Sequence, residues 1–275
     1  MSTEQSAPPG EPKHPIARML AFGAVASIAG VAIALAIPWF PVNATSTTGE
    51  IDTLYDVLVG VSVPIFVLVM TVAIYSVVRF RARPGHTGDG APIHGNTKLE
   101  AIWVAIPTMI VTGLAVYGAI VLSDVEAKKP NELRVKVIAQ QFAWHFQYPQ
   151  LGNVTADQLY LPKDRPVVFD VVTRDVLHDF WVPSFRLKTD AVPGLTTHIR
   201  LTPSRIGTYD VVCAELCGFG HSTMRSFAHV VKPAAFNAWV KKQKSGGAAG
   251  AAGGAGGGGS GSSASTGANT IPSAG

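Results

Sequence analysis

Three long apolar segments in the first half of the chain restrict its folding more than any other feature. They run from about Ile16 to Phe40, from Leu54 to Val78 and from Ala101 to Leu122. At 1.5 Å per residue in a helix, each can cross a hydrocarbon core about 30 Å thick. Only 15% of the 275 residues are charged, whereas a soluble domain has about a quarter. We therefore expect membrane-spanning helices rather than a buried helical hairpin in a soluble protein.

The charges that flank these segments predict their orientation. Arg79, Arg81 and Arg83 directly follow the second segment, in the loop that leads to the third. Basic loops stay on the cytoplasmic side of a membrane. The second segment should therefore run inward and the third outward, which places everything after the third segment outside the cytoplasm. Pro64 and Pro107 lie inside these segments, which packed membrane helices tolerate. The prediction is a multi-pass protein of the cell (plasma) membrane.

The first segment allows two interpretations. A basic stretch at residues 13–18 opens it, and the small-residue stretch VNA, ending at Ala44, follows it. A basic start, an apolar middle and a small-residue site are the three parts of a secretory signal peptide, although this apolar middle is long for one. Residues 1–44 are therefore either a cleaved signal peptide or an additional transmembrane segment. Residues 45–125 are expected to form a two-helix transmembrane hairpin.

After the third segment the pattern changes to short strands. In "ELRVKVIAQQFAWHF" the apolar Leu133, Val135 and Val137 alternate with charged side chains. The runs "PVVFDVVT", "THIRLT", "GTYDVVC" and "SFAHVVK" are further short strands, separated by Gly and Pro. They predict an all-β sandwich or Greek-key barrel over residues 126–244, closed by the short helix "PAAFNAWVKKQK". Residues 245–275 are mostly Gly, Ala and Ser and predict a flexible tail.

The stretch "CAELCGFGHSTM" holds both cysteines of the chain, Cys213 and Cys217, together with His221 and Met224. It lies between two predicted strands, and a loop held by a rigid barrel is a common place for a site. One interpretation is a disulfide, which leaves the histidine and the methionine unexplained. Thiolates with imidazole would suit zinc, and the added thioether favours copper. Two cysteines allow two copper ions that share both thiolates.

Such a site needs a further histidine from outside the loop. Four others lie on the extracytoplasmic side: His145, His178, His198 and His229. His178, in "RDVLHDFWVP", stands at a strand-to-loop junction, from which a side chain can reach a loop site. The other three fall within alternating strands, where a surface or core role is expected.

Together these motifs resemble subunit II of the haem-copper cytochrome c oxidases. The matching stretches are "NTKLEAIWVAIP" at the third segment, "DVLHDFWVPSFRLKTDAVPG" and "CAELCGFGHSTM". The resemblance implies a membrane-anchored, cupredoxin-like Greek-key barrel that carries a binuclear copper centre, CuA. It also implies six ligands: Cys213 and Cys217 shared by both metals, His178 and Met224 on one copper, and His221 and the backbone carbonyl of Glu215 on the other.

The same resemblance implies an aa3-type oxidase in which this chain contacts subunits I and III. Electrons from cytochrome c would enter at CuA and pass to the haem-copper subunit I, which reduces O2 to water and pumps protons. The side chain of Glu215 would help to bind a magnesium ion at the interface with subunit I. Glu100 matches the entrance of a proton channel, although a carboxylate at a helix start also suits the helix dipole alone.

The chain departs from the resemblance in the strand "QQFAWHFQYP". Phe142 stands where relatives have an exposed tryptophan that receives the electron, and Trp144 matches a second aromatic residue, so both are candidates for electron entry. From Asp124 to Lys232 there are eleven acidic and thirteen basic residues, whereas a basic cytochrome c is steered by an acidic surface. The donor is therefore expected to be less basic, membrane-tethered or held in a larger assembly.

The same residues argue against several alternative functions. A quinol-oxidase subunit keeps the fold without copper, and Cys213 and Cys217 argue against it. A nitrous-oxide-reductase-type chain carries a large preceding catalytic domain, for which 275 residues leave no room. A membrane-anchored copper carrier is opposed only by Glu100, Glu215 and the resemblance of the hairpin.

The formal charge of +4, without a long basic run, argues against nucleic-acid binding. No C-x-x-C-H motif follows Cys217, so the tail is expected to carry no haem.

Overall fold

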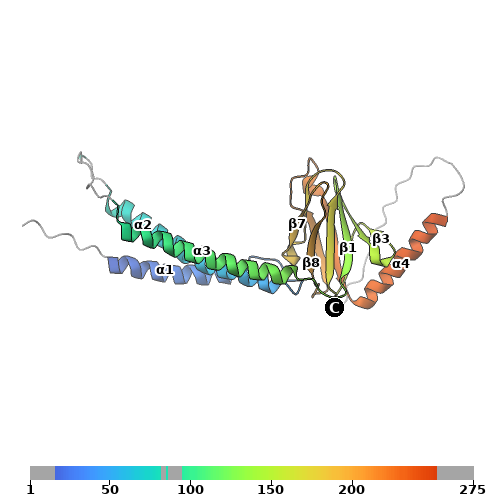
Figure 1. Cartoon of the computed structure of the whole chain (residues 1–275), viewed down its shortest axis with the longest axis horizontal. Helices are drawn as coiled ribbons and strands as arrows, with labels where there is room; N and C mark the ends of the chain where they lie inside the picture. The colour runs from blue at the N-terminus through green and yellow to red at the C-terminus, as the bar shows by residue number, and fades with distance from the viewer. Residues whose placement is uncertain (1–15, 82–84, 86–94, 253–275) are drawn as a thin grey trace, which may run out of the picture.

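The computed structural model describes residues 16–81, 85 and 95–252 and shows a bundle of long helices joined to a β-barrel (Figure 1). The long helices are α1 (Ile16–Ala36), α2 (Thr48–Arg79) and α3 (Thr97–Glu126). All three are long and apolar enough to cross a membrane. Helix α3 starts after Asn96, whose side chain accepts hydrogen bonds from two backbone N–H groups of the first turn. Arg79 ends α2, and Arg83 lies outside the described residues.

Helix α1 lies along α2 (Figure 1), and glycine makes this close approach possible. A Cβ added at Gly30 would lie 2.9 Å from Cγ1 of Val63, so no larger residue fits there without a shift. A Cβ at Gly23 would lie 3.9 Å from the side chain of Thr71. Small residues at a helix interface are typical of packed membrane helices. Helix α1 therefore packs against α2 as a third helix of the bundle.

Two five-stranded sheets form the barrel. The first has the order β3-β2-β1-β5-β8 and the second β4-β10-β9-β6-β7. The strands of the first sheet are β1 (Leu133–Gln140), β2 (Ala143–Tyr148), β3 (Val154–Ala156), β5 (Val167–Thr173) and β8 (Thr197–Leu201). Those of the second are β4 (Leu159–Pro162), β6 (His178–Trp181), β7 (Lys188–Ala191), β9 (Gly207–Cys213) and β10 (Arg225–Val231). Short 3-10 helices occupy Pro149–Leu151, Pro183–Phe185 and His221–Thr223.

The core lies between the two sheets. Leu133, Val135 and Val137 are fully buried, which confirms the alternation predicted for β1. Phe169 and Phe180 pack against each other across the core, with ring centroids 5.6 Å apart. Strand β1 pairs in parallel with β5 and antiparallel with β2. The predicted runs at β5, β8, β9 and β10 are all strands, so the expected all-β architecture is confirmed.

The link between α1 and α2 is built into the base of the barrel. Ala44 has no exposed surface; its N–H donates to the carbonyl of Ser184 at 3.1 Å, and its carbonyl accepts from the N–H of Ser204 at 2.9 Å. Thr45, 2% exposed, forms a β-bridge with Pro203. This segment therefore behaves as part of the barrel rather than as a loose connection.

Arg186 fastens the same link from the barrel side. Its Nε and Nη2 donate to the two carboxylate oxygens of Asp52 at 2.7 and 3.2 Å, which is a bidentate ion pair. Its Nη2 also donates to the carbonyl of Pro41 at 2.9 Å, and its guanidinium lies 4.7 Å from the ring centroid of Phe40. The side chain is only 5% exposed. The side chain of Arg186, which belongs to the barrel, thus binds both the link and the start of α2.

The strands run across the direction of the membrane helices (Figure 1). Strand β1 starts shortly after α3 ends, and at about 3.3 Å per residue its eight residues carry the chain about 25 Å from this base. On the side of α3, Leu122 and Val125 line a cleft together with Leu187 and Ile199 of the barrel. The β7–β8 side of the barrel therefore faces the helices. The end of the barrel opposite the base, which the chain reaches at the end of β1, projects to the side of the helix bundle (Figure 1).

Helix α4 (Pro233–Ala252) closes the domain where the sequence predicts a short helix. Its Trp239 stacks on Tyr160 at 4.5 Å, and Phe236 is buried in the core. The helix continues to Ala252, into the segment expected to be a tail. Residues 253–275, the rest of that expected tail, lie outside the described residues.

Candidate metal centre

The loop between β9 and β10 brings two free thiols together at the far end of the barrel. The Sγ atoms of Cys213 and Cys217 are 3.8 Å apart, and both cysteines are free. A disulfide requires about 2.05 Å between the sulfur atoms, so the disulfide interpretation does not describe this arrangement. The two thiols instead face the same small space.

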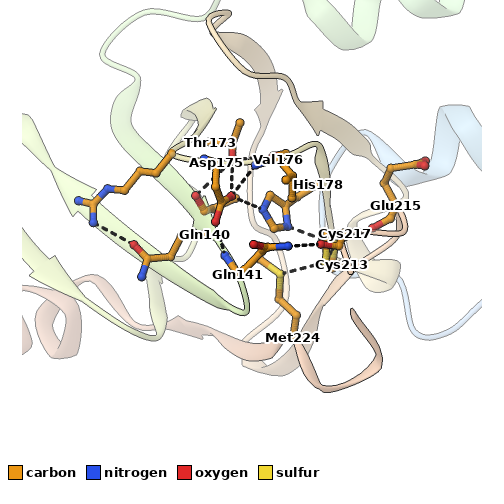
Figure 2. Close-up of polar contacts among 12 residues, drawn as sticks. Gln140, Gln141, Thr173, Asp175, Val176, His178, Cys213, Glu215, Cys217 and Met224 are labelled. Carbon is orange, nitrogen blue, oxygen red and sulfur yellow. Dashed lines mark hydrogen bonds and ion pairs between the residues drawn. The ribbon is translucent and has the colours of Figure 1, made fainter. Parts of the chain in front are cut away.

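Four further donors surround the thiols, and Figure 2 shows most of them. Nδ1 of His178 lies 3.9 Å from Sγ of Cys213, and the carbonyl oxygen of Glu215 accepts from the same thiol at 3.2 Å. Nδ1 of His221 lies 3.7 Å from Sγ of Cys217, and Sδ of Met224 lies 3.8 Å from it. His178, Cys213 and Cys217 alone place their ligand atoms within 4.8 Å of one another. The structure therefore gathers all six predicted ligands in one place.

Burial makes this cluster a soft, water-poor site. His178 and Met224 have no exposed surface, and Cys217 is 4% exposed. Burial, reinforced by the neighbouring Cys213, raises the pKa of the Cys217 thiol to about 11. A buried thiol pair becomes a pair of thiolates when a cation binds between the sulfur atoms. The donor set of two sulfurs, two imidazoles and a thioether fits copper.

Asp175 holds His178 in the orientation that a metal ligand needs. Nε2 of His178 lies 2.9 Å from Oδ1 of Asp175, and Nδ1 is directed at the thiols (Figure 2). In the tautomer that donates from Nε2 to the carboxylate, Nδ1 is free to bind a metal. Burial alone would raise the pKa of Asp175, but hydrogen bonds, including those from the Gln141 N–H and His178, lower it to about 2. Asp175 is not among the site residues predicted from the sequence. Its signal is the D-x-x-H spacing, because a bend just before β6 brings the carboxylate to the imidazole three residues later.

The turn between β1 and β2 covers the ligand loop from outside. Nε2 of Gln141 donates to the carbonyl of Cys217 at 2.7 Å. The ring of Phe142 lies against the loop so closely that a Cβ at Gly218 would be 3.3 Å from it and a Cβ at Gly220 only 2.5 Å. Phe142 is 37% exposed. It therefore lies between solvent and the ligand loop.

Trp144, the second candidate for electron entry, lies on the inner side of the site. It is 2% exposed, and its ring packs edge-to-face against His178 with centroids 6.2 Å apart. It also contacts Phe180 in the core at 5.5 Å. The two candidates thus differ in access, because only Phe142 can touch another protein.

The side chain of Glu215 points away from the thiols (Figure 2), and its charge acts on Asp179 of β6 and Lys188 of β7. Nζ of Lys188 donates to Oδ2 of the buried Asp179 at 2.9 Å. Burial raises the pKa of Asp179, while the hydrogen bond from Lys188 opposes this effect. Because β7 faces the membrane helices, this cluster lies on the membrane side of the ligand end.

The remaining candidates lie away from this centre. Glu100 is in the first turn of α3, with a carboxylate oxygen only 2.5 Å from where a Cβ on Gly95 would be. His145 hydrogen-bonds Asp157, and His198 hydrogen-bonds Asp170. His229 makes hydrogen bonds to Thr208 and Gln158. These three histidines therefore have the surface roles expected of histidines in alternating strands.

Comparison with known proteins identifies the family of the chain. The cytochrome C oxidase subunit II transmembrane domain matches residues 32–120, and the periplasmic domain of the same subunit matches residues 155–231. Cytochrome c oxidase subunit 2 of Thermostichus vulcanus is 32% identical over 79% of this chain and 84% of its own length. The chain belongs to the cytochrome c oxidase subunit II family. It is therefore a membrane-anchored component of an oxidoreductase complex, with a cupredoxin-like domain outside the cytoplasm.

Other relatives of this chain carry related names. The Synechocystis sp. cytochrome c oxidase subunit 2 is 32% identical over 77% of this chain and 80% of its own length. A probable quinol oxidase subunit 2 of Staphylococcus saprophyticus is 33% identical over 66% of this chain and 50% of its own. Among solved structures, the periplasmic domain of subunit II of cytochrome oxidase of Bradyrhizobium japonicum is 26% identical, with a TM-score of 0.42, over 44% of this chain and 98% of that one.

Proposed function

We propose that this subunit II is the electron-entry subunit of an aa3-type cytochrome c oxidase and holds a binuclear copper centre, CuA. The observation that carries the proposal is the convergence of four further donors on two thiols 3.8 Å apart. The copper pair, when bound, accepts one electron from cytochrome c and releases it to the haem-copper subunit I. The chain's own contribution is to hold the ligands rigidly and to exclude water.

The distribution of donors around the thiols favours two metals over one. The resemblance assigns His178 and Met224 to one copper, and His221 and the Glu215 carbonyl to the other. Cys213 lies next to one donor of each pair, His178 and Glu215. Cys217 likewise lies next to one of each, Met224 and His221. Thiols placed between both pairs are suited to bridging, whereas a single blue-copper site needs one cysteine.

The site is built for electron transfer rather than for bond chemistry. All six ligands come from the protein, and four of them belong to buried residues. A catalytic metal needs an open coordination position for its substrate. Because the barrel fixes the ligands, little would reorganise when the centre gains or loses an electron.

The two sides of the ligand end would face different partners. The side of Glu215 and Lys188 faces the membrane helices, which suits contact with subunit I and a magnesium ion held in part by Glu215. The side of Phe142 is open to an electron donor, and Trp144 supports the ligand His178 from behind. Glu100 is proposed as the entrance of a proton channel, and subunit III as a further partner in the plasma membrane.

Metal analysis of the full-length chain together with its EPR spectrum tests the proposal. We expect two copper ions per chain and a spectrum of one electron shared between them. One copper per chain with a four-line signal would refute it. A copper-free chain would instead support the quinol-oxidase type of subunit, and a chain that co-purifies with no oxidase subunit would support a copper carrier.

Replacing Met224 by leucine should keep copper bound but change its reduction potential. The thioether is fully buried and is a soft but weak donor. Leucine has a similar volume, so the core should remain packed. Redox titration of the copper-loaded variant measures the shift, and loss of all copper would contradict the assignment.

We also propose that residues 1–44 are retained and that α1 is a third transmembrane helix. Cleavage after Ala44 would remove two backbone hydrogen bonds at the barrel base. It would also place an ammonium group on Thr45, which is 2% exposed, and burying an unpaired charge is costly. Mass spectrometry of the intact purified chain should find residues before Thr45, whereas a mature chain that starts at Thr45 would overturn this proposal.

A further inference from the structure

An apolar groove with a volume of about 530 Å³ runs between α1 and α2, in the half of the helices farther from the barrel. Its walls include Met19, Phe22 and Ala26 of α1 and Phe66 and Ile74 of α2. Among the described residues, no other helix lines it. Pockets that hold small ligands occupy about 300–1,000 Å³ and are mostly apolar. The groove therefore has the size and the lining of a binding site for an apolar molecule.

The length of the groove matches one leaflet of a membrane. On α2 it extends from Val78, next to the cytoplasmic end, to Phe66, a distance of about 18 Å along the helix. Just beyond it the helices meet, because a Cβ at Gly30 would lie 2.9 Å from Cγ1 of Val63. Half of a hydrocarbon core about 30 Å thick is about 15 Å. The groove therefore fits the acyl chain of a lipid in the cytoplasmic leaflet, whereas a spanning helix would need about twice its length.

Basic side chains surround the cytoplasmic end of this groove. Arg18 lines it, and Arg79 and Arg81 lie at the end of α2. All three are exposed, and none of them forms an ion pair with another described residue. At these helix ends the described residues include a single acidic one, Glu100 of α3, whose first turn also carries Lys98. The local charge is therefore positive, which attracts anionic lipid headgroups.

Tyr75 places a hydrogen-bond donor at the depth of lipid ester groups. It lines the groove four residues before Arg79, which is about 6 Å along the helix. Its hydroxyl is buried and has no hydrogen-bond partner in the part of the chain that the structure describes. A polar group left unpaired within a bilayer is costly. A phospholipid in the groove would place its ester oxygens at this depth, where one can accept from the hydroxyl.

We infer that the groove holds an acyl chain of an anionic phospholipid from the cytoplasmic leaflet, and that Arg18 pairs with the phosphate of this lipid. The inference does not depend on the copper centre, but it rests on the proposal that residues 1–44 are retained, because α1 forms one wall of the groove. That wall, at residues 18–26, precedes the segment 32–120 that matches the transmembrane domain of the family. A bound lipid would also stabilise the packing of α1 on α2, since it binds only when both helices are in place.

Native mass spectrometry of the full-length chain in a nonionic detergent tests the lipid site. The probes are dioleoylphosphatidylglycerol, which is anionic, and dioleoylphosphatidylcholine, which has the same acyl chains and no net charge. We expect one phosphatidylglycerol per chain, bound about tenfold more tightly than phosphatidylcholine, because only the headgroup charge differs. Equal binding of the two lipids, or no bound lipid, overturns the inference.

The variant Ala26→Phe tests the groove as the place of binding. The larger ring fills part of the cavity and changes no charge, so we expect both lipids to bind about tenfold more weakly. The matched control is Ala21→Phe, which adds the same ring at an exposed position of α1 that does not line the groove and should bind both lipids normally. Unchanged binding by Ala26→Phe, or an equal loss in the control, contradicts the assignment of the groove.

The variant Arg18→Gln tests the headgroup contact without altering the helix packing, because Arg18 is exposed. We expect phosphatidylglycerol to bind about fivefold more weakly and phosphatidylcholine to bind as before. The matched control is Lys98→Gln, which removes a cation from the same membrane surface but not from the groove, and should change neither affinity. An equal loss in both variants would indicate diffuse attraction to a basic surface and would refute a specific site.

The same mass spectra separate the possible failures. A chain that starts at Thr45 overturns both the retention of α1 and the lipid site. A chain that keeps α1 and binds no lipid overturns the lipid site alone. Two chains that associate without lipid show that a second copy covers the groove, which also overturns it. Copper content, measured on the same sample, tests the proposed function independently of the lipid.

Discussion

Replacing Cys217 by serine should abolish the shared-electron spectrum and leave at most one copper ion per chain. The thiol of Cys217 adjoins both His221 and Met224, so its loss removes a donor from both proposed metal positions. Serine is close in volume, and its hydroxyl is a poor ligand for a soft metal. Metal analysis and EPR of the purified variant measure the effect.

The control for this experiment is Ser222→Ala in the same loop. Ser222 is exposed and next to the ligand His221, yet it offers no donor to the thiols. It should keep both coppers and an unchanged spectrum. A Cys217→Ser chain that retains two coppers and the shared-electron signal would rule out thiolate bridging.

Replacing Arg186 by alanine should give the largest loss of stability of the predicted changes. The arginine is 5% exposed and pairs with Asp52, so its removal leaves a half-buried carboxylate without its partner. Breaking a buried ion pair costs about 3–5 kcal/mol, which corresponds to a fall of about 10 °C in the Tm of a domain of this size. Thermal unfolding of the full-length chain in detergent, followed by tryptophan fluorescence, measures it.

The control is Arg134→Ala. Arg134 also pairs with an aspartate, Asp170, but its side chain is 49% exposed. Exposed ion pairs contribute about 1 kcal/mol or less, so this variant should melt within a few degrees of the unmodified chain. Equal melting of the two variants would show that the link between α1 and α2 does not depend on Arg186.

The parts of the fold with regular patterns were predictable from the sequence. Apolar length marks the membrane helices, and alternation marks β1, whose buried positions match the predicted ones. The ligand loop was predictable because its donors are rare residue types at short spacing. His178, 35 residues before Cys213, was predictable from its position at the end of a strand and from the resemblance.

The missed features depend on contacts between distant segments. The stretch around Ala44 reads as a polar link or a cleavage site, yet residues near 184 and 203 supply the backbone partners that bury it. Strands β6 and β7 are too short for alternation to reveal them. Asp175 reads as a turn residue, and only the folded chain brings the N–H of Gln141, 34 positions away, to its carboxylate.

The barrel lies across the direction of the helices and is joined to them near Arg186, while the ligand loop lies at its opposite end. A small rotation of the barrel about Arg186 therefore moves the ligand loop. Strand β1 spans about 25 Å from the base, so a tilt of about 5° about Arg186 would move the ligand end by about 2 Å. If the chain has the proposed function, the distance that an electron crosses to subunit I therefore depends on contacts at the opposite end of the domain. In that case, a substitution at the base is expected to slow electron transfer without moving the ligands relative to one another.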